Sequence, residues 1–184
     1  QIIDLGTYLE NVVEDLTPEL GGDLNALNQE INNIDGSSFN IAPSTIGGIA
    51  NIWWNPDDET FNFGLNSDVT LQVGQEQVYH VKADVAITNG QSVMVVGAVG
   101  ASGKLLAAPT NAPTEDLYII GIATQDIAIG EFGFVSSFGS VRGIVTDGSN
   151  YGETWIDGDI IYDDPSVAGG LTNVKPSKPD ENVV

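Results

Sequence analysis

His80 is the chain's single histidine, and it is the first residue to examine for acid–base or nucleophilic chemistry. A Ser-His-Asp or Cys-His mechanism needs a histidine beside an activated hydroxyl or thiol, with a further group that orients the ring. His80 instead lies in residues 78–82, whose alternating residue types predict a β-strand. We therefore interpret it as a half-exposed strand residue. Zinc is not expected either, because the chain has no cysteine and no second histidine.

Carboxylates are the most abundant chemically active groups, and clusters of them occur at residues 57–59, 157–159 and 163–164. Two facing carboxylates can hydrolyse a glycosidic bond, so composition alone leaves a carbohydrate-active enzyme open. All three clusters lie in expected turns, where Asp side chains bond nearby backbone amides. We assign them to turn formation, and we predict no catalytic residue and no cofactor.

Acidic turns of this kind can also bind Ca²⁺. An EF-hand loop that started at Asp157 would place Ala168 at its twelfth position, where a bidentate glutamate is required. We therefore predict no EF-hand. Ca²⁺ binding of another type is a hypothesis that rests on the acidic clusters and on the net charge.

Residues 97–104, Gly-Ala-Val-Gly-Ala-Ser-Gly-Lys, superficially resemble a phosphate-binding loop. Such a loop needs glycine where Ala98 stands, and Ser or Thr where Leu105 stands, to hold phosphate and Mg²⁺. Neither position matches, and the glycine spacing does not fit a dinucleotide site. We interpret the segment as a loop between strands.

The charge of the chain is strongly unbalanced. The 184 residues contain 26 acids and only 5 bases, which gives a formal net charge of −21. A surface of this kind repels the phosphate backbone of nucleic acids and anionic lipid surfaces, so neither is expected as a partner. No apolar run reaches the roughly 18 residues that a membrane-spanning helix needs, and membrane insertion is not expected.

Short β-like runs separated by turn residues follow one another from residue 51 onward. The 22 glycines fit this pattern, since glycine suits turns and bulges with positive φ. Asn89-Gly90 is a strong hairpin signal, and we find no repeat with a fixed period of 20–50 residues. We predict an all-β fold, either an antiparallel sandwich or a barrel-like module with glycine-rich turns. Strands are expected at residues 69–73, 78–82, 92–96, 118–123, 132–138, 143–145 and 159–162, and a long loop at 97–113.

Residues 1–50 differ from the rest. Apolar residues in 9–16 and 24–31 have helical spacing, but neither segment reaches the roughly 12–15 residues that an isolated helix needs. We expect an extended or short-helical N-terminal arm, which either packs on copies of itself or is flexible. The expected organisation is an arm for oligomerisation and attachment (1–50), a β-hairpin connector (51–76), an all-β C-terminal domain (77–173) and an extended proline-containing tail (174–184).

The connector carries four aromatic residues on its two arms, Trp53 and Trp54 before the turn and Phe61 and Phe63 after it. Adjacent residues of a strand point to opposite faces of its sheet, so we expect at least one ring of each pair to face inward. An outward ring could stack on a sugar or fill an intersubunit contact, where Trp is enriched. We name these four residues as candidate interface residues.

The order of several motifs along the chain resembles the fibre and other structural proteins of tailed bacteriophage virions. The hairpin phrase at residues 52–76 and Thr17-Pro-Glu-Leu-Gly-Gly-Asp-Leu24 carry the resemblance in the first half of the chain. Further similar phrases follow at residues 89–93, 121–127, 130–135, 138–143, 155–160, 170–172 and 175–179. The phrase at residues 17–24 departs from the usual pattern after Leu24, where Ala26-Leu-Asn28 replaces a glycine turn.

This resemblance implies a non-enzymatic component of the virion, located on the tail or the capsid exterior. The expected partners are further copies of the chain in a homotrimer, other virion proteins, and a host surface glycan or protein receptor. Leu20 and Leu24 of the arm are then additional candidate interface residues. A tail fibre or appendage that takes part in host attachment is the first expectation. A capsid decoration protein and a virion-borne carbohydrate-active enzyme are the alternatives.

Overall fold

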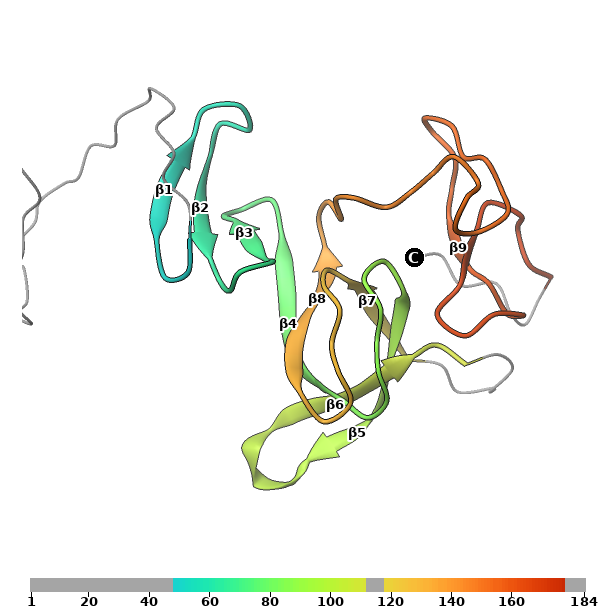
Figure 1. Cartoon of the computed structure of the whole chain (residues 1–184), viewed down its shortest axis with the longest axis horizontal. Coiled ribbons are helices and arrows are strands. Elements are labelled where there is room, and N and C mark those ends of the chain that lie inside the picture. Colours follow the sequence, from blue (N-terminus) through green and yellow to red (C-terminus); the bar gives the residue numbers. More distant parts are fainter. Residues whose placement is uncertain (1–47, 112–117, 178–184) are drawn as a thin grey trace, which may run out of the picture. The chain divides into compact units, whose positions relative to one another are not determined.

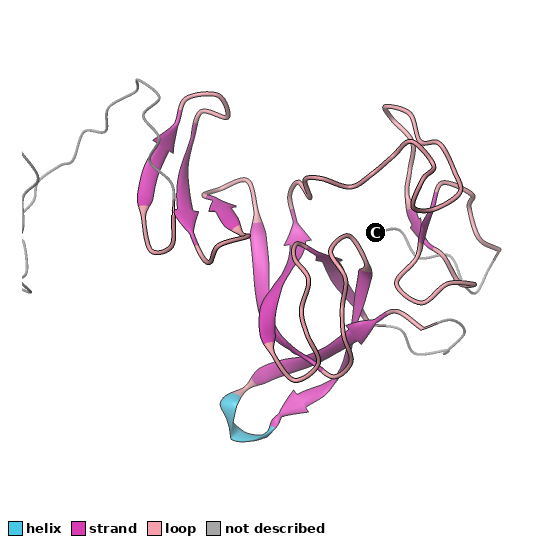
Figure 2. Cartoon of the chain, in the orientation of Figure 1, coloured by secondary structure: helices cyan, strands magenta, loops and turns pink. Residues whose placement is uncertain are grey.

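The regular secondary structure of the described part of the chain consists almost entirely of β-strands joined by loops and turns (Figure 2), which confirms the predicted all-β class. The computed structural model describes residues 48–111 and 118–177. All of them belong to one compact unit that begins at Phe39. The N-terminal arm, Leu20, Leu24 and most of the tail lie outside the described residues. Within those residues the helical structure is a single short 3₁₀ helix, η3 (Gly100–Ser102).

The predicted hairpin is present and is extended into a three-stranded antiparallel sheet (Figure 1). Its strands are β1 (Ile52–Asn55), β2 (Thr60–Gly64) and β3 (Thr70–Gln72). The turn between β1 and β2 is built by Asn55, whose Oδ1 accepts the backbone N–H of Asp57 at 3.0 Å. This is the local bonding that favours Asn at the start of a turn.

The next strands close into a barrel, so the structure selects the barrel over the sandwich. Neighbouring strands follow the order β4-β6-β5-β7-β8, and β8 pairs with β4 to complete the closure. The β4–β6 pair is parallel and the remaining pairs are antiparallel. The strands are β4 (Gln77–Ala83), β5 (Ser92–Val99), β6 (Lys104–Pro109), β7 (Ile119–Ala123) and β8 (Phe132–Phe138).

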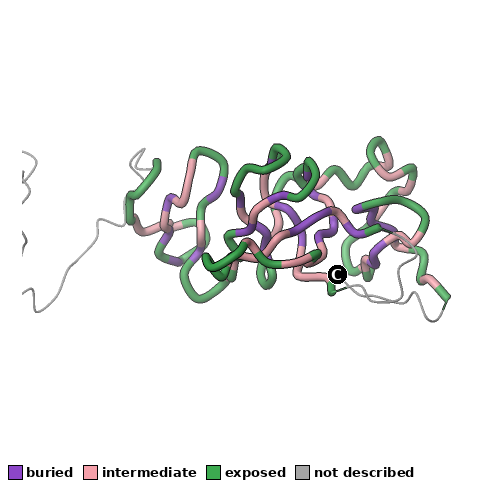
Figure 3. The backbone as a smooth tube through the Cα atoms, turned by 90° about the horizontal axis from the view of Figure 1, so that it is seen from below, coloured by how far each residue is buried: buried purple, intermediate pink, exposed green. Residues whose placement is uncertain are grey.

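Aliphatic side chains fill the barrel, and Figure 3 colours the buried stretches of the backbone purple. A barrel with few strands has a narrow interior, which suits Val and Ala better than aromatic rings. Along β4 the inward side chains alternate with outward ones, so Val81 and Ala83 are buried while His80 is exposed. The core cluster consists of Val81, Ala83, Ile87, Val93, Ala107, Ala123, Ile127 and Val135.

Two loops of the barrel are related by an internal pseudo-two-fold symmetry, although the sequence shows no repeat. Residues 84–91 connect β4 to β5, and residues 124–131 connect β7 to β8. Equivalent backbone groups bond reciprocally: Gly90 N–H donates to Ala123 O at 2.9 Å, and Gly130 N–H donates to Ala83 O at 2.8 Å. Both glycines have positive φ, at 83° and 80°. The Asn89-Gly90 turn therefore exists, but it leads out of a loop rather than out of a strand.

Residues 139–177 are mostly turns, with a small sheet of two strands, β9 (Tyr162–Asp163) and β10 (Leu171–Thr172). The strand expected at 143–145 was wrong, and the one expected at 159–162 is β9, shifted toward the C-terminus. The long loop expected at 97–113 was also wrong. Residues 97–109 complete the β5–β6 hairpin around η3, because each arm finds backbone partners on the other.

Candidate functional site

The β1-β2-β3 sheet has one polar and one aromatic face. The register pairs Trp54 with Phe61, and Ile52 and Leu71 with Phe63. Paired residues share a face, and so do residues two apart along a strand. Trp53 therefore lies on the opposite face from Trp54, whereas Phe61 and Phe63 lie on the same one. We call Ile52, Trp54, Phe61, Phe63 and Leu71 the aromatic face.

The aromatic face is partly open to solvent. Ile52 is 54% exposed and Phe61 is 37% exposed, and the other three side chains are only partly covered. The rings of Trp54 and Phe61 touch edge to face, with centroids 5.2 Å apart and planes at 77°. Such ring contacts stabilise the pair by about 0.5–1.5 kcal/mol beyond the area that they bury. The face is therefore held together from within and still leaves apolar surface in water.

The opposite face carries half-buried Trp53 together with three buried polar residues. Thr60, Asn62 and Gln72 are 5%, 5% and 3% exposed. The Gln72 amide donates to Asp58 Oδ2 and accepts from Arg142, and the Thr60 hydroxyl donates to Val73 O at 2.9 Å. The sheet thus reverses the usual arrangement, in which apolar side chains are buried and polar ones meet the solvent.

Arg142 connects this polar face to a distant part of the chain. Its guanidinium donates to Glu76 Oε1 at 3.0 Å and lies 3.8 Å from Asp58 Oδ2. Glu76 Oε2 in turn accepts the backbone N–H of Gln72 at 2.9 Å. The sequence did not indicate Arg142, because its partners lie about 70 residues earlier in the chain.

The acids of the predicted turn clusters bond to their own surroundings. Asp159 Oδ2 accepts the backbone N–H of Ile156 and the side-chain amide of Asn173, both at 3.0 Å, and these bonds lower its pKa. Asp164 Oδ1 accepts the backbone N–H of Ser166 at 2.8 Å. These contacts match the turn-forming role expected from the sequence.

The Glu153 carboxylate links the segment around Trp155 to the end of β10 by hydrogen bonds. Burial opposes ionisation, but the hydroxyl of Thr172, the indole N–H of Trp155 and the backbone N–H of Asn173 all donate to the carboxylate. Together these hydrogen bonds lower the pKa of Glu153 below its ordinary value. This role could not be predicted from local patterns, since two of the three donors are 19 and 20 residues away.

Of the acids in the described residues, Asp163 is the buried one, at 2% exposure. Burial raises its pKa, the hydrogen bond from the Thr110 hydroxyl opposes that rise, and the charge of Asp164 adds to it. The Thr110 hydroxyl also accepts the backbone N–H of Gly169 at 3.1 Å. This buried contact attaches the β9–β10 region to the end of β6.

His80 lies on the outer face of the barrel between Phe132 and Phe134. Its ring centroid is 5.4 Å from that of Phe132 and 4.8 Å from that of Phe134. Lys104 Nζ is 3.1 Å from His80 Nδ1. Desolvation and the nearby lysine charge both lower the pKa of His80, so the ring is neutral at pH 7.

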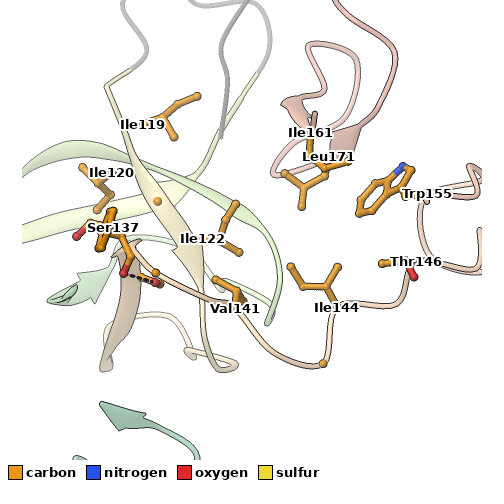
Figure 4. Close-up of a pocket in the computed structure, with 15 residues that line it drawn as sticks. Ile119, Ile120, Ile122, Ser137, Val141, Ile144, Thr146, Trp155, Ile161 and Leu171 are labelled. Carbon is orange, nitrogen blue, oxygen red and sulfur yellow. Dashed lines mark hydrogen bonds between the residues drawn. The ribbon is translucent and has the colours of Figure 1, made fainter. Parts of the chain in front are cut away.

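A partly open pocket of about 570 Å³ lies between the barrel and the loop region (Figure 4). Ile120 and Ile122 of β7, Ile144 and Trp155 of the loops, and Leu171 of β10 form much of its wall. Its volume is within the range of small-molecule sites, roughly 300–1,000 Å³. The hydroxyls of Ser136, Ser137 and Thr146 and the indole of Trp155 lie among the aliphatic side chains, so the wall is of mixed polarity.

Several other expectations concern sites of binding. Within residues 48–111 and 118–177, no group of three or more His, Asp or Glu is placed to hold a metal ion. The loop that superficially resembles a phosphate site is the η3 turn of the β5–β6 hairpin. In the same described residues, no helix has the length and apolar character needed to cross a membrane.

Comparison with known proteins identifies no relative of this chain. No family model matches the sequence, and no curated protein or solved structure matches it either.

Proposed function

We propose that this chain is a non-enzymatic structural component of a tailed-phage virion, a fibre or appendage protein that assembles through its aromatic face and takes part in host attachment. The motif order described above motivates the phage assignment. The sheet with a buried polar face and an exposed aromatic face is the observation that carries the assembly role.

Exposed aromatic side chains on so acidic a chain favour an interface. Contiguous apolar surface rimmed by polar residues marks interaction sites, and Trp and Phe are enriched in interface cores. Covering Ile52, Trp54 and Phe61 with another copy would remove this surface from water. Two acids with lowered pKa values, Glu153 and Asp159, accept hydrogen bonds that stabilise the described loops. This structural role agrees with a scaffold rather than a reaction centre.

Light scattering at neutral pH and moderate salt tests the assembly. We expect a mass of three copies of the 19.3 kDa chain, because salt screens the repulsion between chains that each carry a net charge of −21. Ile52→Glu should lower that mass, since it places a charge on the aromatic face. Ile156→Glu is the matched control, as Ile156 is 73% exposed and Ile52 is 54% exposed. A monomeric native chain contradicts the proposal, and so does equal behaviour of the two variants.

Labelling of intact particles tests the location. Antibody raised against the purified chain should label tailed particles from the source culture, and a fibre or appendage protein is expected on the tail. Label on the capsid surface would instead assign the chain to capsid decoration. Particles without label would contradict a virion role altogether.

A further inference from the structure

Three strands of the barrel present cations and aromatic rings on one outer face. Along β4, His80 and Lys82 point outward, because Val81 and Ala83 between and after them are buried. The register places Phe134 of β8 opposite His80 and Phe132 opposite Lys82, so each pair shares a face. Lys104 of β6 joins them through its contact with His80. We call His80, Lys82, Lys104, Phe132 and Phe134 the cationic face.

The rings and the ammonium groups of this face hold one another in place. Lys82 Nζ lies 5.9 Å from the centroid of Phe132, within the range of a cation–π contact. A lysine ammonium has no acceptor, so at 3.1 Å Lys104 Nζ must donate to Nδ1 of a neutral His80. Phe132 is 45% exposed and Phe134 is half-buried, so the face keeps some aromatic surface in contact with solvent beside the cations.

Among the described residues, neither lysine has a carboxylate partner within 4.0 Å, although the chain has an excess of carboxylates. The ion pairs within 4.0 Å among residues 48–111 and 118–177 both belong to Arg142. The acids nearest along the strands are Asp84 and Glu131, which border the Lys82 end of the face. Lys82 and Lys104 carry two of the five basic charges of the chain. A partner with negative charge and apolar surface fits this face.

We infer that the cationic face docks the aromatic face and the acidic β1–β2 turn of a second copy of this chain. The turn carries exposed Asp57 and Glu59, and it lies at the end of the hairpin next to the Trp54–Phe61 pair. Phe132 and Phe134 match the aromatic face, and Lys82 and Lys104 match the two acids. Complementary charge of this kind sets the register of an interface and disfavours wrong partners.

The contact joins two different surfaces, so it is heterologous. Such contacts generate a closed ring when the rotation between copies closes, and an open filament when it does not. The inference rests on the proposed assembly role and names the two faces that meet. It also explains how chains with a net charge of −21 can associate, since it brings the unpaired cations of one copy to the acids of the next.

Charge reversal on the two faces tests the contact. Lys82→Glu with Lys104→Glu should weaken association by roughly tenfold or more, measured by light scattering across a dilution series. Asp57→Lys with Glu59→Lys should weaken it similarly. The second pair lowers the net negative charge, so general repulsion alone predicts the opposite result. The chain with all four changes keeps the formal net charge of −21 and should regain the native mass.

Each outcome decides the matter. Loss of association in both reversed pairs and recovery in the fourfold variant support the docking contact. An oligomer that survives both reversed pairs but is lost in Ile52→Glu overturns this inference and leaves the proposed assembly role standing. If the reversed pairs change only the binding of an acidic polysaccharide such as polygalacturonate, the face serves a foreign ligand and the contact is overturned. Circular dichroism of each variant confirms that the β-fold is retained.

Discussion

Ile87 and Ile127 exchange both of their backbone hydrogen bonds across the barrel. The N–H of Ile87 donates to the carbonyl of Ile127 at 2.9 Å, and the N–H of Ile127 donates to the carbonyl of Ile87 at 2.8 Å. Both side chains are 2% exposed and belong to the core cluster. The two loops that connect β4 to β5 and β7 to β8 therefore meet at one symmetric point, and each covers the interior of the barrel with the same side chain.

Shortening one of these isoleucines should strongly destabilise the barrel. We expect Ile127→Ala to lower the free energy of unfolding by about 2–5 kcal/mol, because it removes buried methyl groups and leaves a cavity. Ile129→Ala is the matched control in the same loop. Ile129 is 68% exposed, and its replacement should change stability by no more than about 0.5 kcal/mol. Urea unfolding followed by circular dichroism measures both, and similar losses in the two variants would contradict the placement of Ile127.

A side chain in place of Gly121 of β7 would clash with β8. Its φ is +145°, and an added Cβ would lie 1.8 Å from the carbonyl oxygen of Ser136. Gly121→Ala must therefore move the backbone of β8, and we expect a loss of more than about 2 kcal/mol. Gly103 has φ +68° and open space around its Cβ position. Gly103→Ala should cost only about 1 kcal/mol, from backbone strain alone. Thermal unfolding of both variants compares these costs, and a smaller loss at Gly121 would refute the close approach of β7 and β8.

Asp163 should make the protein less stable as the pH rises. Its folded pKa is raised above the ordinary value of 3.8, so protonated Asp163 favours the folded state. This contribution is complete below about pH 3.8 and is lost as the pH rises through the folded pKa. Between the two pKa values, the slope approaches about 1.4 kcal/mol per pH unit. Asp163→Asn removes the titration and can still accept from Thr110.

The measurement for Asp163 is the difference in unfolding free energy between the native chain and Asp163→Asn, followed from pH 3 to pH 7 by urea titration. As the pH rises, the free energy of unfolding of the native chain should fall relative to that of the variant. A difference that stays constant over this range would show that Asp163 is ionised as readily in the folded chain as in the unfolded one.

Glu153 should act in the opposite direction. Its folded pKa lies below the ordinary value of 4.5, so the carboxylate stabilises the fold above about pH 4.5, and this stability is lost as the pH falls through the folded pKa. Glu153→Gln leaves one oxygen to serve three donors and should cost about 1 kcal/mol at pH 7. Glu59→Gln changes an exposed acid of the hairpin turn and should be nearly neutral. Denaturant midpoints at pH 7 and pH 4 separate the two variants; a Glu153 effect that grows as the pH falls would reverse the sign argued above.

Local patterns determined much of the fold. The alternation and turn residues of 51–64 predict the β1–β2 hairpin, and the run at 132–138 coincides with β8. The all-β class followed from the same patterns. These features depend on neighbouring residues, since strand alternation and Asx turns act over only a few positions. The turn-forming role of Asp159 and Asp164 could be predicted for the same reason, whereas the turn expected at Asp163 was wrong, because this residue lies buried in β9 and bonds to Thr110.

Tertiary contacts decided the rest. The two loops of the symmetric pair share only three identical residues at equivalent positions of 81–92 and 121–132, which are Ala83 with Ala123, Ile87 with Ile127 and Gly90 with Gly130. Their relationship is carried by backbone hydrogen bonds, which leave no repeat in the sequence. Residues 97–109 looked like a loop because Gly and Ala have little strand preference, and β6 became a strand through its partners β5 and β4.

The candidate interface likewise depends partly on local sequence patterns and partly on tertiary contacts. The sequence by itself placed Trp54 and Phe61 on facing arms of a hairpin, because the turn between them sets the register. It could not decide which face of that hairpin is buried. In the structure Gln72 of the polar face is buried and bonded to Arg142, which also contacts Asp58 and Glu76, while the aromatic face stays partly exposed. Arg142 meets its partners only after the chain has folded, so no periodic pattern in the sequence indicates these contacts. The aromatic face could therefore be recognised only in the tertiary structure.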